Sequence, residues 1–389
     1  MDLRLSEETR MLQGMVRDFA NEKLKPRAAE LDRTCEFPWD HWRAMGELGL
    51  LGMLVPDQYG GPGMTNLDYA TALEEIAVGC AATAVIMSVQ NSLAIFPIQA
   101  FGNEEQKARY LPKLASGEWV GCYALTEPGA GSDAASLKCS CVKKGDRWVL
   151  NGAKQFITNA AEAHLAIVYA TKDPAMRTKG ICAFLVERDF PGYSVGKHED
   201  KMGIRGSSTA PIVLEDCEVP EANLLHEEGR GFSVAMATLD GGRIGIGSQA
   251  LGIARAALEA AIGYSKQREQ FGAPISTLQA IQWKLADMAT RVDAVRLLIR
   301  RAAWIKDQGQ NHSIEASMAK LMASETAVWC ANQAVQVHGG YGYTKEYVVE
   351  RLYRDAKITD LYEGTSEIQR LVIAANLLKG AYRGADTLE

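Results

Sequence analysis

Apolar residues change their spacing twice along the chain. From residue 6 to about 117, side chains such as Met11, Met15, Val16 and Phe19 recur on one helical face, which is typical of amphipathic helices. From about 118 to 219 the period shifts towards two, and β-branched and aromatic residues become denser. Such alternation predicts strands. The chain therefore begins with a helical region that a β region follows.

The strands and later helices can be placed by their spacing. The β region predicts a strand, a turn and a second strand at 142–150, and further strands at 181–186 and 212–214. A helical period then returns in four segments, which are residues 250–262, 281–306, 314–338 and 366–378. The pattern predicts a mainly α protein with a central β domain and a C-terminal helical bundle.

The length of the chain requires more than one hydrophobic core. With 389 residues, it exceeds the size at which a single core stops growing. Combined with the change of period, this predicts an N-terminal helical domain at 1–117, a middle β domain at 118–225 and a helical-bundle domain at 226–389. A hydrophobic content of 47% and a charged content of 23% are those of an ordinary globular protein.

Charge and cysteine spacing exclude several classes of function. The net charge of −6 and the lack of a dense lysine or arginine block argue against a nucleic-acid surface. The eight cysteines are scattered, and Cys139 and Cys141 have no second pair to complete a zinc site. Residues 76–103 carry no charge, but Gln90, Asn91 and Pro97 interrupt them, which favours a helix buried in protein over a membrane span.

A turn near the C-terminus carries the strongest candidate for chemistry. Gly364 can adopt a positive φ that Glu363 could not adopt cheaply. Ser366 and Gln369 fit a capping box for a new helix, whose apolar positions predict one buried face. An apolar approach through Leu361 and Tyr362 would raise the pKa of Glu363 into the range of a general base. Taken alone, a solvated loop carboxylate is the simpler interpretation.

Glycine-rich segments do not predict a common nucleotide fold. Residues 129–134, Gly-Ala-Gly-Ser-Asp-Ala, fit the loose form of a dinucleotide fingerprint. Pro128 precedes them, however, and no strand–turn–helix unit surrounds them, so a Rossmann site is not predicted. No Gly-x-x-x-x-Gly-Lys-Ser/Thr sequence occurs. A nucleotide cofactor would therefore need a different fold.

Several segments together resemble one enzyme family. Residues 361–370, Leu-Tyr-Glu-Gly-Thr-Ser-Glu-Ile-Gln-Arg, resemble the signature that carries the catalytic glutamate of acyl-CoA dehydrogenases. Residues 123–133, Tyr-Ala-Leu-Thr-Glu-Pro-Gly-Ala-Gly-Ser-Asp, are similar to a second signature of that family. The matches keep the family's order across essentially the whole chain and look closest to the short-chain, butyryl-type branch. The resemblance implies the acyl-CoA dehydrogenase fold, with a β-barrel-like middle domain and a C-terminal four-helix bundle.

The resemblance also implies an FAD cofactor and its contacts. Phe156 stands where many relatives have tryptophan, and it would still offer an aromatic face to the flavin. The implied FAD contacts are Tyr123, Leu125, Thr126, Gly131, Ser132, Phe156, Ile157, Thr158, Arg268, Gln270, Phe271, Gln279, Gln336, Gly339, Gly340, Thr365 and Glu367. In the family the contacts at 268–279 and 336–340 reach the flavin from a neighbouring subunit, which implies an oligomer, expected to be a homotetramer. For Glu367, complementing the dipole of its helix is the simpler role.

Substrate contacts and chemistry follow from the same resemblance. The family implies contacts to acyl-CoA from Ser132, Asp240, Arg243 and Gly364. Glu363 would remove a proton from Cα while FAD accepts a hydride from Cβ, giving the 2-enoyl-CoA. The backbone N–H of Glu363 and a ribityl hydroxyl of FAD would stabilise the developing enolate oxygen. Some relatives carry their base near position 242, but Gly242 has no carboxylate, which leaves the role to Glu363.

Partners and substrate remain broader expectations. Family behaviour implies an electron-transferring flavoprotein as electron acceptor. An acyl-CoA oxidase that uses oxygen and a non-catalytic assembly subunit are the alternatives. Ala84 and its uncharged neighbours provide no basic residue for a dicarboxylic acyl group, so a short, branched, cyclic or aryl acyl group is expected. The N-terminus lacks a targeting pattern, which predicts a cytoplasmic bacterial protein or, as the alternative, a mature protein of an organellar matrix.

Overall fold

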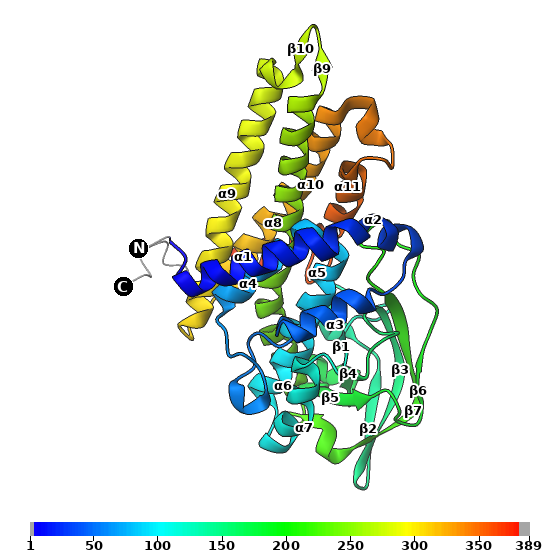
Figure 1. Ribbon diagram of the computed structural model, residues 1–389. Coiled ribbons are helices and arrows are strands. Elements are labelled where there is room, and N and C mark those ends of the chain that lie inside the picture. Colours follow the sequence, from blue (N-terminus) through cyan, green and yellow to red (C-terminus); the bar gives the residue numbers. More distant parts are fainter. Residues whose placement is uncertain (1–3, 381–389) are drawn as a thin grey trace.

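The N-terminal region is built from helices, as its apolar spacing predicts. The computed structural model describes residues 4–380, and Figure 1 shows three regions. The N-terminal helices are α1 (Glu7–Phe19), η1 (Ala20–Leu24), α2 (Lys25–Thr34), α3 (Trp39–Glu47), η2 (Asp57–Tyr59), α4 (Asn66–Gly79), α5 (Ala81–Ser88), η3 (Val89–Ile95), α6 (Phe96–Phe101) and α7 (Glu104–Ala115). Side-chain caps define several starts. Asn103 accepts a hydrogen bond from the backbone N–H of Gln106, and the Gln106 side chain accepts one from the Asn103 N–H.

The uncharged stretch is a buried helix, as expected. Among the described residues, one helix is long and apolar enough to cross a membrane by length and composition, Ala81–Phe101, and 94% of its apolar window is buried inside the protein. Its polar side chains are bonded internally. Gln90 Nε2 donates to the carbonyl oxygens of Leu114 and Trp119, and Asn91 Nδ2 donates to that of Leu50. This helix therefore belongs to the protein core.

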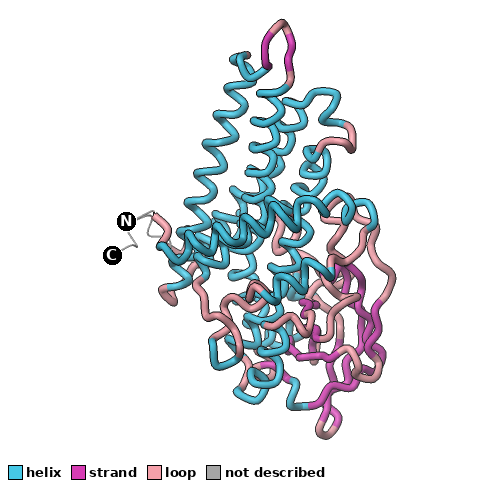
Figure 2. Tube along the Cα trace, viewed as in Figure 1, coloured by secondary structure: helices cyan, strands magenta, loops and turns pink. Residues whose placement is uncertain are grey.

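The middle region is an eight-stranded mixed sheet, and the predicted strands are confirmed. Its strands are β1 (Gly121–Ala124), β2 (Ser140–Lys144), β3 (Arg147–Thr158), β4 (Leu165–Thr171), β5 (Ile181–Glu187), β6 (Tyr193–Val195), β7 (Thr209–Pro220) and β8 (Leu224–Leu225). Short 3-10 turns η4 (Ala134–Ser136), η5 (Pro174–Gly180) and η6 (Glu221–Asn223) lie between them. The order is β6-β7-β3-β2-β4-β5-β8, with β1 parallel to β4. Figure 2 shows the strands gathered on one side of the helices.

The C-terminal region is a helical bundle. It consists of α8 (Gly231–Gln267), α9 (Gln279–Asp307), α10 (Ser313–His338), α11 (Val348–Lys357) and α12 (Ser366–Leu378), with strands β9 (Glu269–Gln270) and β10 (Ala273–Pro274) and turns η7 (Ile275–Thr277), η8 (Gly339–Tyr343) and η9 (Ile358–Asp360). The expected helices at 281–306 and 314–338 agree closely with α9 and α10. Helix α11 was not among the predicted segments.

Helix α8 begins 19 residues before the predicted segment. Its first half contains several glycines, which lower intrinsic helix propensity, so the pattern there did not indicate a helix. Close packing against α4 and α5 explains Gly245. A Cβ at this position would lie 2.5 Å from Ser88 Oγ and 2.7 Å from Tyr69 OH. Tertiary packing thus overrides propensity at this helix.

The predicted buried face of α12 is wrong for a single chain. The prediction placed Ile368, Leu371, Val372, Ala375 and Leu378 on a buried face, but Leu371 is 64% exposed and Leu378 is 89% exposed. The buried residues of α12 are Ser366 and Gln369 in its first turn. An apolar face therefore remains uncovered within one chain.

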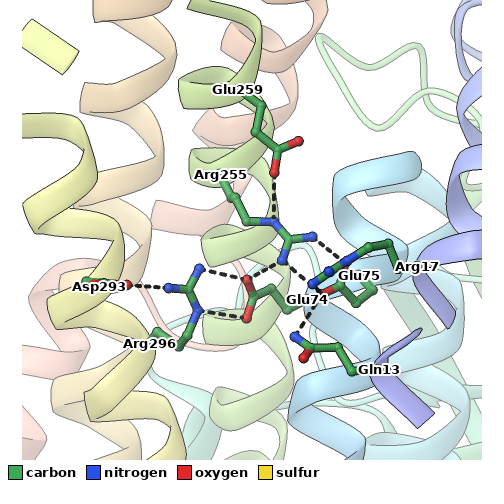
Figure 3. A network of polar contacts seen from close by, with 8 residues as sticks. All are labelled: Gln13, Arg17, Glu74, Glu75, Arg255, Glu259, Asp293 and Arg296. Atoms are coloured by element: carbon green, nitrogen blue, oxygen red, sulfur yellow. Dashed lines mark hydrogen bonds and ion pairs between the residues drawn. The ribbon is translucent and has the colours of Figure 1, made fainter. Parts of the chain in front are cut away.

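Two buried carboxylates join the N-terminal helices to the bundle, as Figure 3 shows. Glu74 and Glu75 of α4 lie against Arg255 of α8, whose Nη1 is 2.8 Å from Glu74 Oε1. Arg296 of α9 pairs with Glu74 at 3.0 Å, and Arg17 of α1 pairs with Glu75 at 2.9 Å. Burial alone would raise the pKa of Glu75, but hydrogen bonds from Arg255 and Arg17 outweigh it and lower this pKa to about 2.

Candidate active site

Glu363 lies in a strained turn between η9 and α12. Its φ is +51°, and that of Gly364 is +92°, so both residues adopt left-handed backbone conformations. The expectation that Glu363 would avoid a positive φ is therefore wrong. A non-glycine residue in this region costs of order 1–3 kcal/mol and persists only where surrounding contacts impose it.

Side chains from two helices hold this turn. Gln369 Nε2 of α12 donates to the carbonyl oxygens of Glu363 and Gly364 at 3.1 and 3.0 Å. Lys320 Nζ of α10 donates to the same Gly364 oxygen at 2.7 Å. The predicted capping box is wrong, because Thr365 is the N-cap and accepts from the N–H of Ile368 at 3.3 Å. Gln369 is instead used to fix the turn.

One oxygen of the Glu363 carboxyl group is shielded from solvent, and the residue as a whole is half-buried. Oε2 is buried and has no hydrogen-bond partner among the described residues. Burial raises the pKa of Glu363 to about 7, although the positive charges of Lys320 and Arg243 act in the opposite direction. A carboxylate of this pKa can accept a proton near neutral pH.

Position 242 on α8 faces this carboxyl group directly. A Cβ built on Gly242 would overlap Glu363 Oε2 and lie 3.0 Å from its Cδ. The lack of a side chain at 242 therefore leaves the space that the Glu363 carboxyl group occupies.

We expect Gly242→Ala to displace the Glu363 carboxyl group and to lower kcat/KM at least tenfold, which corresponds to about 1.4 kcal/mol of transition-state stabilisation. Steady-state kinetics with FAD content measured in parallel will test this. Gly263→Ala on the same helix is the control, because nothing lies within 4 Å of a Cβ there. Equal losses in both variants would contradict a specific steric role for position 242.

Aromatic and amide groups surround the turn on its other sides. Tyr69 OH donates to Ser88 Oγ at 3.1 Å. Tyr362 OH donates to Gln249 Oε1, and Gln249 Nε2 donates to the carbonyl oxygen of Ala81 at 2.8 Å. These bonds tie the residue next to Glu363 to helices α8 and α5.

The predicted CoA contacts Asp240 and Arg243 lie one turn apart on α8. Arg243 is buried and its Nη1 is 2.5 Å from Asp240 Oδ1. Ser313 Oγ donates to the same carboxylate at 3.0 Å, and Arg243 Nη1 also donates to Ser317 Oγ at 3.2 Å. The pair is thus oriented from α10, close enough to Glu363 for the charge of Arg243 to affect its pKa. Ser132 lies in an exposed loop after β1.

The two predicted flavin segments of the β region lie side by side. The N–H of Gln155 donates to the carbonyl oxygen of Thr126 at 2.9 Å. Lys154 Nζ of β3 is 2.7 Å from Glu127 Oε1 in a buried ion pair, and it also donates to the carbonyl oxygen of Leu125 at 3.3 Å. The backbone N–H groups of Lys138 and Cys139 donate to the Glu127 carboxylate. The loop at 125–127 is therefore anchored to β3.

An extra residue in β3 turns Phe156 outwards. The pairing of β3 with β7 shifts between Lys154 and Ile157, which is a β-bulge, a feature common beside active sites. Phe156 has a φ of +57° and is 63% exposed, whereas Ile157 is buried and Thr158 is half-buried. An exposed ring next to Gln155, whose N–H bonds Thr126, suits stacking on a planar group. The OH of Tyr123 in β1 is 3.4 Å from the carbonyl oxygen of Ala235, and Gly131 is exposed.

The predicted cofactor residues at 268–279 and 336–340 lie at the other end of the molecule, whereas Thr365 and Glu367 lie next to Glu363 at the start of α12. A cavity of about 500 Å³ is lined by Tyr264, Arg268, Gln270, Ile275, Val337, His338, Gly339, Gly340, Tyr341 and Thr344. Phe271 is almost fully exposed, and Gln279 and Gln336 are exposed nearby in the sequence. Figure 1 places β9 and β10 at the far tip of the bundle from β3. One chain therefore does not bring the two predicted sets together.

Comparison with known proteins identifies the family. The domain pattern described as "Acyl-CoA dehydrogenase, N-terminal domain" matches residues 6–118, the middle domain matches 122–217, and the C-terminal domain matches 229–378. The chain belongs to the acyl-CoA dehydrogenase family. The dehydrogenase is therefore FAD-dependent, and the resemblance and fold class inferred from its motifs are confirmed.

Individual relatives agree over nearly their full length. The human short-chain specific acyl-CoA dehydrogenase, a mitochondrial protein, is 54% identical over 97% of this chain and 92% of the relative. The butyryl-CoA dehydrogenase of Megasphaera elsdenii superposes with a TM-score of 0.96 at 43% identity, covering 97% of this chain and all of that one. A chain from a structural study of the electron transferring flavoprotein of Acidaminococcus fermentans also superposes with a TM-score of 0.96. It is 47% identical, and the match covers 97% of this chain and all of that one.

Sequence reasoning did not identify the residues that support the site. Lys320, Gln249, Tyr69 and the pair of Lys154 with Glu127 were not predicted. One feature of the sequence could have indicated Lys320, which is the lone lysine in the otherwise uncharged segment 316–324 of α10. The described residues contain no cluster of three or more side chains able to hold a metal ion.

Proposed function

We propose that this acyl-CoA dehydrogenase acts on a short-chain acyl-CoA and that Glu363 is the base that removes the Cα proton. The observation that carries the assignment is the buried, unpartnered Oε2 of Glu363, on a group whose pKa is raised by burial to about 7. Such an oxygen is shielded from solvent and poised to accept a proton at neutral pH. Glu367, by contrast, is exposed in the first turn of α12, and backbone hydrogen bonding lowers its pKa.

The residues of the β region fit the isoalloxazine ring of FAD. When bound, FAD supplies the acceptor for the hydride that leaves Cβ. Phe156 offers an exposed aromatic face, and Thr126 and Thr158 offer hydroxyl and backbone groups beside it. The buried pair of Lys154 with Glu127 keeps these groups in register. The thioester would lie between this face and the Glu363 turn, where the Glu363 N–H can stabilise negative charge on its oxygen.

We assign the diphosphate and adenine contacts to a second copy of the chain. Arg268, Gln270, Gly339 and Gly340 line one cavity at the tip of the bundle, away from β3 of the same chain. Arginine forms strong charge-assisted bonds to phosphate. Exposed apolar side chains on α9 and α12, including Trp283 and Leu371, support burial between copies. Light scattering should give four times the chain mass of 42.3 kDa, whereas a monomer that binds FAD would contradict this assignment.

The electron acceptor is proposed to be an electron-transferring flavoprotein. The structural similarity to the Acidaminococcus fermentans chain supports this assignment. Turnover is expected to be fast with that flavoprotein and slow with oxygen alone. Equal turnover with oxygen alone would indicate an acyl-CoA oxidase instead.

A short acyl group is proposed from the uncharged surroundings of the site. Ala84 and its neighbours on α5 and η3 are buried and carry no charge, so a terminal carboxylate would be left without a partner at high cost. We expect butyryl-CoA to bleach the flavin at least tenfold faster than glutaryl-CoA in anaerobic stopped-flow measurements. Branched and cyclic acyl-CoAs belong in the same panel. A faster reaction with glutaryl-CoA would contradict the proposed substrate class.

The proposed compartment is the bacterial cytoplasm, with an organellar matrix as the alternative. The human relative is described as mitochondrial. All eight cysteines are free thiols, and seven of them are buried, which suits a reducing compartment.

A further inference from the structure

Lys320 is a buried cation without a counter-ion of its own. It lies in the first third of α10 with none of its surface exposed. Its Nζ makes one hydrogen bond, to the carbonyl oxygen of Gly364 at 2.7 Å. Among residues 4–380, Lys320 forms no ion pair, whereas Arg243 is paired with Asp240. Burying an unpaired ammonium group is costly, so its position requires a reason beyond packing.

The backbone next to Glu363 needs external restraint. Two successive residues, Glu363 and Gly364, have positive φ, which an isolated turn would not favour. The carbonyl oxygens of this pair accept three hydrogen bonds, two from Gln369 and one from Lys320. Gln369 is also fully buried. A Cβ on Gly364 would lie 2.6 Å from Gln369 Nε2, so the fit around the turn is close.

The charges around Glu363 come from several elements. The groups whose charges act on the carboxylate or are affected by it are Arg243 of α8, Lys320 of α10, Tyr69 of α4, Tyr123 of β1 and the adjacent Tyr362. Lys320 is influenced in addition by Asp360, Glu367 and Arg243. The three tyrosines are neutral in this range because burial raises their pKa values further. Two cations therefore act on Glu363, and Asp240 already neutralises one of them.

We propose that Lys320 is a positioning residue for the Glu363 turn, which Lys320 and Gln369 both hold in place. Its ammonium group also supplies the positive charge that keeps the Glu363 carboxyl group ionisable in a buried site. The proposal rests on the proposed role of Glu363 as the base. It assigns two separable tasks to Lys320. The hydrogen bond to Gly364 sets the direction of the turn, and the charge sets the pH at which the base is ionised.

The sign of the electrostatic effect can be stated. A nearby positive charge favours the carboxylate over the carboxylic acid and so lowers the pKa of Glu363. Loss of that charge must raise this pKa and move the rising limb of the pH profile of kcat/KM towards higher pH. Burial lowers the pKa of Lys320 itself to about 8. The Lys320 charge therefore acts on Glu363 only below about that pH. At higher pH the rates of the wild type and of a variant that keeps the hydrogen bond without the charge should converge.

Two substitutions separate the tasks. Lys320→Gln keeps a hydrogen-bond donor and removes the charge, whereas Lys320→Met removes both. We expect both variants to raise the midpoint of the kcat/KM profile by about one pH unit or more. We expect Lys320→Met alone to lower the plateau at high pH as well, by at least tenfold, because its turn is no longer held. Lys284→Met is the matched control, since Lys284 bonds Gln333 Oε1 between α9 and α10 at 2.7 Å.

A second readout does not depend on turnover. The infrared difference spectrum between a protein and its Glu363→Gln counterpart gives the carboxyl C=O stretch of Glu363. We would follow this band as a function of pH in the FAD-loaded oligomer. Its midpoint should rise in both Lys320 variants and stay unchanged in Lys284→Met. An unchanged midpoint in Lys320→Gln with normal FAD content overturns the proposal, even where Lys320→Met fails to fold. Full turnover by Glu363→Gln would overturn the proposed function instead.

Discussion

Glu363→Gln is expected to lower kcat by about 10²- to 10⁴-fold, which is the contribution typical of a general base. The fold and FAD binding should persist. Glutamine keeps the shape of the side chain and cannot accept the Cα proton. Anaerobic mixing with butyryl-CoA should leave the flavin of this variant yellow. Glu325→Gln is the control, because Glu325 is exposed and pairs with Arg370 on the surface. Normal turnover by Glu363→Gln would remove the assignment of the base.

The pH dependence of the wild type follows from the same group. The base must be ionised to act, and burial raises the pKa of Glu363 to about 7. The value of kcat/KM should therefore rise with pH through about 7 and level off above it. A rising limb near pH 4.5, the ordinary value for a glutamate, would mean that the carboxyl group is hydrated in the free enzyme.

Glu75→Gln is expected to lower the free energy of unfolding by about 3–5 kcal/mol, as for a buried ion pair that loses one partner. The substitution removes one of the two buried carboxylates that Arg255 bonds between α4 and α8, leaving Glu74, and it releases Arg17 of α1. Urea denaturation of the FAD-loaded protein at pH 7 will measure the change. Glu259→Gln is the control, because that carboxylate is 53% exposed and 3.4 Å from the same Arg255. Its loss should cost no more than about 1 kcal/mol.

The sign of the pH dependence is fixed by Glu75. Its pKa is lowered from 4.5 to about 2 in the folded state, so its contribution to stability is complete above about pH 4.5 and is lost as the pH falls towards 2. The wild type should therefore lose more stability than Glu75→Gln over this interval. Parallel losses in the two proteins would contradict the role assigned to the pair.

The sequence predicted the elements that have a long periodic pattern of apolar residues. It missed those whose conformation depends on tertiary contacts. Helices α9 and α10 have long periodic segments, and their predicted bounds lie within two residues of the observed ones. The first half of α8 was missed because its glycines lower helix propensity, although they permit close packing against α4 and the Glu363 turn. The apolar spacing of α12 predicted its helix but not its burial, because a single chain leaves residues such as Leu371 uncovered.

The candidate site shows the same division. The motif residues Glu363, Thr126 and Phe156 could be placed by resemblance, and the structure joins their two β-region segments through the bond of the Gln155 N–H to the Thr126 carbonyl oxygen. The positive φ of Glu363 could not be predicted, since it depends on bonds from Lys320 and Gln369, which lie 43 residues before it and 6 residues after it. Local sequence favours Gly364 alone for that conformation. Long-range hydrogen bonds impose it on Glu363 as well.

Proton removal can be isolated from hydride transfer by a suitable thioester. An acyl-CoA analogue with sulfur in place of the β carbon keeps its Cα hydrogens but cannot donate a hydride. Incubated in deuterium oxide with the FAD-loaded protein, it should exchange its Cα hydrogens, with a midpoint near pH 7 set by Glu363. Mass spectrometry should detect no exchange above background with Glu363→Gln. Exchange at the wild-type rate in that variant would show that another group removes the proton.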